Sequence, residues 1–158
     1  MNTADIFAPV STTDDYAHAT TAGDEAHATT TGAYAHADTA GDYAHATTTG
    51  DYAHATTTGA YAQAATAGRL TYATTTGIFA HATTAGFRSN ASVSGENSIA
   101  AAFGANSSAR AANGGFIVLA QYDEDTVVAV KTAQVGKDGI KPDTWYKLSP
   151  TGEFVEAE

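Results

Sequence analysis

All six histidines of this chain are separated by multiples of nine residues, and this spacing suggests a metal-binding hypothesis. Imidazole is a common ligand of divalent metal ions, and the spacing repeats it at a constant interval. The chain has no cysteine, and no carboxylate holds a fixed place beside the histidines to complete a ligand set. We therefore predict no metal site and expect two solvated histidine ladders, made of His18, His27, His36, His45, His54 and His81.

Catalytic chemistry has no support in the sequence. There is no nucleophile elbow and no phosphate-binding loop. The nine-residue unit that carries the histidines also lacks the second glycine and the aspartate of calcium-binding nonapeptides. Because near-identical units build extended surfaces rather than one pocket, we predict a protein that is not an enzyme and that uses no cofactor.

Carboxylates are the second group of side chains whose chemistry suggests a function. Residues 1–67 contain eight of them and no lysine or arginine, and the whole chain has a net charge of −10. A field of this sign repels nucleic acid and anionic membranes and attracts basic protein surfaces. We predict an acidic binding surface and a basic host protein as the partner, with no direct binding of nucleic acid or membrane. The candidate residues are Asp15, Asp24, Asp38, Asp42 and Asp51.

The element that must position these side chains is a nine-residue repeat. Glycine recurs every nine residues from Gly23 to Gly104, and Asp14 takes the same place one unit earlier. Counting glycine as position one, positions four, six and eight carry only small residues or valine, which indicates the inward face of a strand. Since nine residues are too few for a closed coil, the repeat predicts an all-β, parallel β-solenoid, a β-roll with two units per turn.

Aromatic residues recur at position three of the unit. A core of alanine and threonine buries little apolar area, so a thin roll is marginal against the entropy of ordering its chain. The aromatic lines would either close the narrow ends of the flattened coil or become buried between subunits. We favour self-association as a trimer or dimer through Tyr16, Tyr34, Tyr43, Tyr52, Tyr61 and Phe79.

Three regions follow from these patterns. We predict an N-terminal cap segment at 1–11, the nonapeptide-repeat roll at 12–112 and a C-terminal antiparallel β cap or interaction module at 113–158. In the last region, GFIVLAQY and TVVAVKTAQV read as two strands around Asp123–Asp125, and two short strands should meet near 149–152. A cap is expected because an open solenoid end exposes strand edges.

From residue 87 the repeat changes to smaller residues, in the run SNASVSGENSIAAAFGANSSARA. Over about 87–111 this cadence resembles the head repeats of trimeric autotransporter adhesins. The resemblance implies a parallel β-roll and trimerisation. The unit in that family is shorter than nine residues, so this chain should have longer strands.

Two main functional hypotheses remain, with a third behind them. The first is an acidic binding protein, in the form of a phage-encoded inhibitor of a host nucleic-acid-binding enzyme. The second is a structural or adhesive head or tip segment of a phage fibre or adhesin. The third is ice binding through threonine pairs such as Thr29 with Thr31, although alanines interrupt the array. The start of the chain shows no secretion signal, so we expect a cytoplasmic or virion location.

Overall fold

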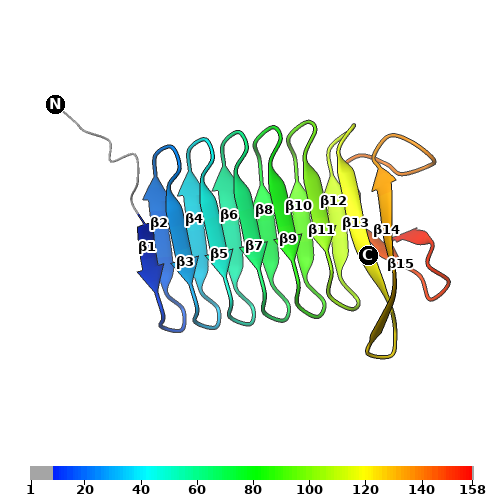
Figure 1. The fold of residues 1–158 in the computed structure, drawn as a ribbon, viewed down its shortest axis with the longest axis horizontal. Helices are drawn as coiled ribbons and strands as arrows, with labels where there is room; N and C mark the ends of the chain where they lie inside the picture. Colours follow the sequence, from blue (N-terminus) through cyan, green and yellow to red (C-terminus); the bar gives the residue numbers. More distant parts are fainter. Residues whose placement is uncertain (1–8, 158) are drawn as a thin grey trace.

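The computed structural model describes residues 9–157 and is an all-β roll built from two eight-stranded sheets (Figure 1). The chain alternates between the sheets, so that each coil contributes one strand to each of them. The coils stack along the long axis of the molecule, and the C-terminal strands lie at one end of the stack (Figure 1). The predicted parallel β-solenoid with two units per turn is confirmed.

The first sheet, called sheet A, holds the odd-numbered strands and ends in a hairpin. Its hydrogen-bonded order is β1 (Pro9–Thr12), β3 (His27–Thr30), β5 (His45–Thr48), β7 (Gln63–Thr66), β9 (His81–Thr84), β11 (Ile99–Ala102), β13 (Phe116–Asp123) and β14 (Thr126–Gln134). All neighbours are parallel except β13 and β14, which are antiparallel.

Sheet B holds the even-numbered repeat strands and the last two strands of the chain. Its order is β2 (His18–Ala22), β4 (His36–Ala40), β6 (His54–Thr58), β8 (Tyr72–Thr75), β10 (Asn90–Val93), β12 (Ser108–Ala111), β15 (Tyr146–Leu148) and β16 (Phe154–Glu156). The pairs from β2 to β12 are parallel, and β15 is antiparallel to both of its neighbours.

The register of the repeat is constant at eighteen residues. His27 lies opposite His45, and Ala28 lies opposite Ala46, and the same offset holds from β1 to β12. Positions four, six and eight are buried in almost every unit, as the alternation predicts. Among residues 9–157 the core is therefore a stack of alanines with threonine beside them, and this part of the chain buries no side chain larger than valine before the last turns.

Glycine at position one is required by the close stacking of successive corners. A β-carbon on Gly50 would collide with the backbone carbonyl of Gly32, and one on Gly68 would collide with that of Gly50. The same conflict recurs at every repeat glycine from Gly32 to Gly104.

The C-terminal region closes the roll with larger side chains. Ile117, Leu119, Val135, Ile140 and Tyr146 are buried and continue the alanine core. The four strands expected here are present, with a bulge where β14 passes Gln121 and Tyr122 of β13. Tyr146 also accepts a hydrogen bond at its hydroxyl from the Lys141 backbone N–H, over 2.9 Å.

Two of the expected region boundaries differ from the structure. The parallel ladder begins at Pro9, because β1 already pairs with β3, and not at residue 12. It also extends past residue 112, because the first half of β13 pairs in parallel with β11. Most of the proposed N-terminal cap, residues 1–8, lies outside the described residues. Across residues 9–157 there is no helix that could cross a membrane.

Candidate functional site: an acidic collar and side-chain ladders

The histidines form two ladders on the outer faces of the sheets, as expected from their spacing. On sheet B, the rings of His18, His36 and His54 stack with centroids 4.7 and 4.8 Å apart, and Tyr72 continues the stack at 4.9 Å. On sheet A, His27 stacks on His45 at 4.7 Å. Gln63 then occupies the next place, opposite both His45 and His81.

This stacking does not suit a bridging metal ion. Two zinc–nitrogen bonds of about 2.0–2.1 Å can join nitrogens at most about 4.2 Å apart. The stacked rings of His27 and His45 are nearly parallel and 4.7 Å apart, so their equivalent nitrogens are too distant for one ion. Within residues 9–157, no three histidine, aspartate or glutamate side chains form a group that could hold a metal.

Two of the histidines have lowered pKa values. Burial lowers the pKa of His45, and the positive charge of protonated His27 beside it lowers that pKa further. Burial and His36 lower the pKa of His54 in the same way, while Asp38 opposes the change. Apart from the histidines, Asp38 is the one acidic or basic side chain in strands β1 to β9. The ladders therefore disfavour protonation of His45 and His54.

The tyrosines occupy the corners of the coils in an unusual backbone conformation. Tyr16, Tyr34 and Tyr52 have φ between 57° and 61°, in the left-handed region that glycine or asparagine usually fills. Their rings stack at 5.0 and 4.8 Å and their side chains are exposed. Tyr43, Tyr61 and Phe79 form the same arrangement on the other side. Position three carries a positive φ in every unit, whereas at position one the φ is positive only at Gly23, Gly41 and Gly59 among the described repeat glycines.

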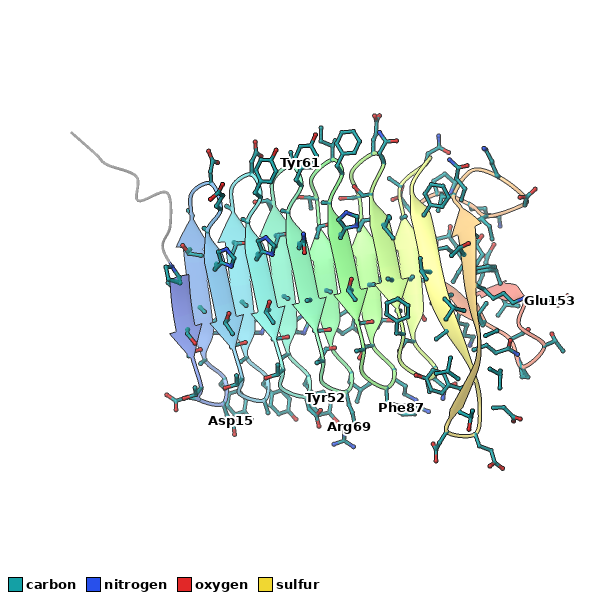
Figure 2. All side chains as sticks on the ribbon, in the orientation of Figure 1. Asp15, Tyr52, Tyr61, Arg69, Phe87 and Glu153 are labelled. Atoms are coloured by element: carbon teal, nitrogen blue, oxygen red, sulfur yellow. The ribbon has the colours of Figure 1, made fainter. Side chains whose placement is uncertain are left out.

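Figure 2 shows that the two tyrosine lines lie on opposite edges of the roll. Tyr52, Asp15, Arg69 and Phe87 lie on one edge, and Tyr61 lies on the other (Figure 2). We call the first the Tyr52 edge; its corners are 14–16, 32–34, 50–52, 68–70, 86–88 and 104–106. We call the second the Tyr61 edge; its corners are 23–25, 41–43, 59–61, 77–79 and 95–97. The aromatic lines thus lie at the narrow ends of the coil, and self-association through them stays a prediction.

The aspartates at position two have a structural partner that the sequence did not reveal. Asp15 Oδ1 accepts a hydrogen bond from the Ala33 N–H over 2.8 Å, one coil further along. Asp24 and Asp42 accept the same bond from Asp42 and Ala60. Asp51 accepts from the Arg69 N–H with Oδ1, and its Oδ2 binds the Arg69 guanidinium at 2.8 and 3.0 Å. These bonds tie successive corners together.

Hydrogen bonding to Arg69 also lowers the pKa of Asp51 and raises that of Arg69. Both side chains lie in solvent, so this ion pair contributes little to stability. It has a clear effect on charge, however, because Arg69 is the first cation after the basic-free stretch and it neutralises the last carboxylate of that stretch.

The five predicted acidic residues do not share one surface. Asp15 and Asp51 lie on the Tyr52 edge, Asp24 and Asp42 lie on the Tyr61 edge, and Asp38 lies on the outer face of sheet B. Together with two neighbouring corner residues they surround the first coils. We call this group the acidic collar: Asp14, Asp15, Asp24, Glu25, Asp38, Asp42 and Asp51.

The threonine pairs are divided between the two faces as well. Thr29, Thr31, Thr47 and Thr49 lie on sheet A, whereas the pairs Thr56 with Thr58 and Thr74 with Thr76 belong to sheet B. Each face therefore presents a small patch of threonine beside histidine or tyrosine, and not a long flat array. Ice binding stays a prediction without an additional observation in its favour.

Serines take over the cross-coil bonding in the last turns. Ser89 Oγ accepts the Thr71 N–H and donates to the Gly68 carbonyl, and Ser98 and Ser107 do the same one and two units later. This gives the serine-rich cadence of residues 89–111 a physical reason. A serine at position four can hold two corners together.

A cavity of about 290 Å³ lies where the roll meets the C-terminal cap. Asn106, Gln121, Glu124, Lys147 and Ser149 line it, together with small and apolar residues. These residues come from a repeat corner, the β13–β14 hairpin and the β15–β16 segment. No sequence pattern connects them, so the sequence could not identify this cavity.

No family model, curated protein or solved structure matches this chain.

Proposed function

We propose that this chain is a non-enzymatic binding protein whose acidic collar docks on a basic surface of a partner protein. The observation that supports this function is the axial density of carboxylates. Asp15 and Asp51 are separated by 36 residues, which is two coils of eighteen. Since stacked strands lie about 4.8 Å apart, the seven carboxylates fall within about 10 Å of rod length.

This density is comparable to that of DNA. Arg69 neutralises Asp51, and the six remaining carboxylates in about 10 Å correspond to about one charge per 1.7 Å, the same spacing as in double-stranded DNA. Along the sequence the same charges are widely spaced. They come close together in the fold because each coil of eighteen residues adds only about 4.8 Å to the length of the roll. Over residues 9–67 no lysine or arginine interrupts the collar. A basic, nucleic-acid-binding surface is therefore the partner chemistry that the collar fits best, and inhibition of such an enzyme is the corresponding role.

The test uses substitutions that remove charge but keep the corner hydrogen bonds. Asp15→Asn, Asp24→Asn, Asp42→Asn and Asp51→Asn keep an Oδ1 acceptor for the N–H one coil further along. We expect the wild-type chain to retain a basic nucleic-acid-binding protein from bacterial lysate at low salt and to release it at high salt. The fourfold variant should lose that protein. Asp123→Asn with Asp125→Asn, at the exposed hairpin turn, is the charge control and should retain it.

An adhesive head or tip segment is the alternative function. The exposed aromatic side chains along both edges favour it, because such rows can contact a surface along the whole rod. Binding of the purified chain to whole cells or glycans, unchanged in the fourfold collar variant, would reject the acidic-binder proposal and support this alternative.

A further inference from the structure

Both edges of the roll expose apolar side chains at positions two and three. On the Tyr52 edge the exposed fractions are 68% for Tyr16, 44% for Tyr34, 42% for Tyr52, 36% for Leu70 and 42% for Phe87. These residues are held at strained or solvent-facing corners, whereas Asn97 and Asn106 fill the same left-handed position in the last units. Tyrosine in that conformation costs more than asparagine. Its repeated use therefore indicates a role for the side chain itself.

We propose that a second copy of this chain packs against the Tyr52 edge, with the two rods antiparallel. The charges of that edge are divided along its length. Asp14, Asp15 and Asp51 lie in its first half, and Arg69 and Arg88 lie in its second half. A twofold axis between the third and fourth corners places Asp51 of each copy opposite Arg69 of the other, so that this ion pair of each chain can also form between the chains. Asp14 and Asp15 of one copy then lie one corner away from Arg88 of the other.

The corner residues match in this arrangement. The third corner, with Asp51 and Tyr52, meets the fourth corner of the second copy, with Arg69 and Leu70. The second corner, with small Ala33, meets the fifth, where Phe87 is large and exposed. In the monomer the Arg88 guanidinium already lies 5.2 Å from the Phe87 ring centroid, so this corner presents a compact apolar and cationic surface to Tyr34.

The Tyr61 edge does not have this self-complementarity. It carries Asp24, Glu25, Asp42 and Glu96 and no lysine or arginine. An antiparallel pair through that edge would place Glu96 of one copy near Asp24 and Glu25 of the other. A parallel pair through the Tyr52 edge is also unfavourable, because each charged residue would face the same residue of the second copy and thus a charge of the same sign. The charge pattern thus selects one edge and one orientation.

The size of the edge limits the strength of the pair. Six corners about 4.8 Å apart give a contact about 25 Å long, and two packed sheets give a thickness of about 10 Å. A contact of about 250 Å² per copy is small beside the roughly 800 Å² per partner of a standard interface. We therefore expect a weak, reversible dimer, and its test compares protein concentrations of about 10 µM and about 500 µM.

Sedimentation velocity over that concentration range tests the proposal. The average mass of the wild-type chain should rise from the monomer value of 16.1 kDa towards twice that value. Phe87→Asp should keep the chain monomeric at every concentration. Ile78→Asp is the matched control, because Ile78 has the same position in the repeat but lies on the Tyr61 edge, where it is 48% exposed. That variant should dimerise like the wild type, and thermal melts of both variants exclude misfolding.

The orientation has its own measurement, which the absence of cysteine makes possible. In a mixture of Asp15→Cys and Ala105→Cys chains, an antiparallel pair places the first corner of one copy beside the sixth of the other. Oxidation should therefore give mainly the mixed disulfide dimer. Three results would each overturn the proposal. The wild-type chain could stay monomeric at about 500 µM, Phe87→Asp and Ile78→Asp could lose the dimer equally, or oxidation could give mainly homodimeric disulfides.

Discussion

The carboxylate of Asp42 accepts a hydrogen bond from the backbone N–H of Ala60, one coil further along, over a distance of 2.8 Å. This bond satisfies a corner N–H that no strand partner reaches. It shows that an aspartate of the acidic collar serves the fold as well as the surface charge.

Replacing Asp42 should therefore affect stability through the acceptor and not through the charge. We expect Asp42→Ala to lower the free energy of unfolding by about 0.5–1 kcal/mol, because the Ala60 N–H loses its protein partner. Asp42→Asn should be close to neutral. Asp38→Ala is the control, since Asp38 projects from the face of β4. Equal losses in Asp42→Ala and Asp42→Asn, measured by urea unfolding, would show that the hydrogen bond is unimportant.

The inward threonines offer a stabilising substitution. Within the described chain, the buried hydroxyls of Thr30, Thr39, Thr48, Thr57 and Thr75 are among those without a hydrogen-bond partner. Val93 already fills the same column of sheet B after Thr75. We expect Thr57→Val to raise the free energy of unfolding by about 1 kcal/mol, because a buried unsatisfied hydroxyl is removed at constant shape.

Thr66→Val is the matched control for that prediction. The Thr66 hydroxyl shares a 2.7 Å hydrogen bond with the Thr71 hydroxyl, so the same substitution breaks a bond there. It should be neutral or destabilising. A Thr57→Val chain that melts below the wild type would contradict the prediction and indicate that this hydroxyl is satisfied in solution.

Corner glycines should tolerate no side chain. A β-carbon on Gly77 would overlap the Gly59 carbonyl oxygen, which belongs to the coil beneath it. We expect Gly77→Ala to cost at least about 3 kcal/mol or to prevent folding, because backbone atoms cannot move aside. Gly114→Ala is the comparison: nothing lies within 4 Å of its β-carbon, and only its φ of 80° is unfavourable. Circular dichroism melts of both variants provide the measurement, and similar melting temperatures would contradict the steric explanation.

Stability should fall as the histidines are titrated. Histidines of the unfolded chain titrate at about pH 6.5. Because the pKa values of His45 and His54 are lowered in the fold, the folded chain binds fewer protons than the unfolded chain in this range. The free energy of unfolding is then constant above about pH 7.5 and decreases as the pH falls through about 6.5 towards 5. Thermal melts at these values measure the change.

The chain supplies its own control for the pH effect. Gln63 occupies a ladder position on sheet A without disturbing the register. His45→Gln with His54→Gln should therefore fold and should reduce the loss of stability at low pH. An equal loss in that variant would assign the pH dependence to other groups.

Much of the fold was predictable from residues that recur at fixed positions of the nine-residue repeat. The constant spacing of Gly32, Gly50 and Gly68 sets the corners, and the small residues at alternating positions set the inward face. These signals are local, since a strand places alternate side chains on one face whatever surrounds it. With two units per coil they also predict the stacking of His18 on His36, which the structure confirms.

The backbone conformation of the corners, the partners of the aspartates and the density of the charges depend on residues one coil away, so they follow only from the tertiary structure. In the corner at 50–52, Tyr52 and not Gly50 has the left-handed conformation. Glycine is needed at position 50 for another reason, because the Gly32 carbonyl lies where a β-carbon would be. The tertiary structure placed Asp15 and Asp24 on opposite edges and gave each a backbone partner eighteen residues later. It also compressed the collar charges into two coils. Sequence spacing carries the periodicity of the chain, but hydrogen bonds, edges and charge density arise only when successive coils stack.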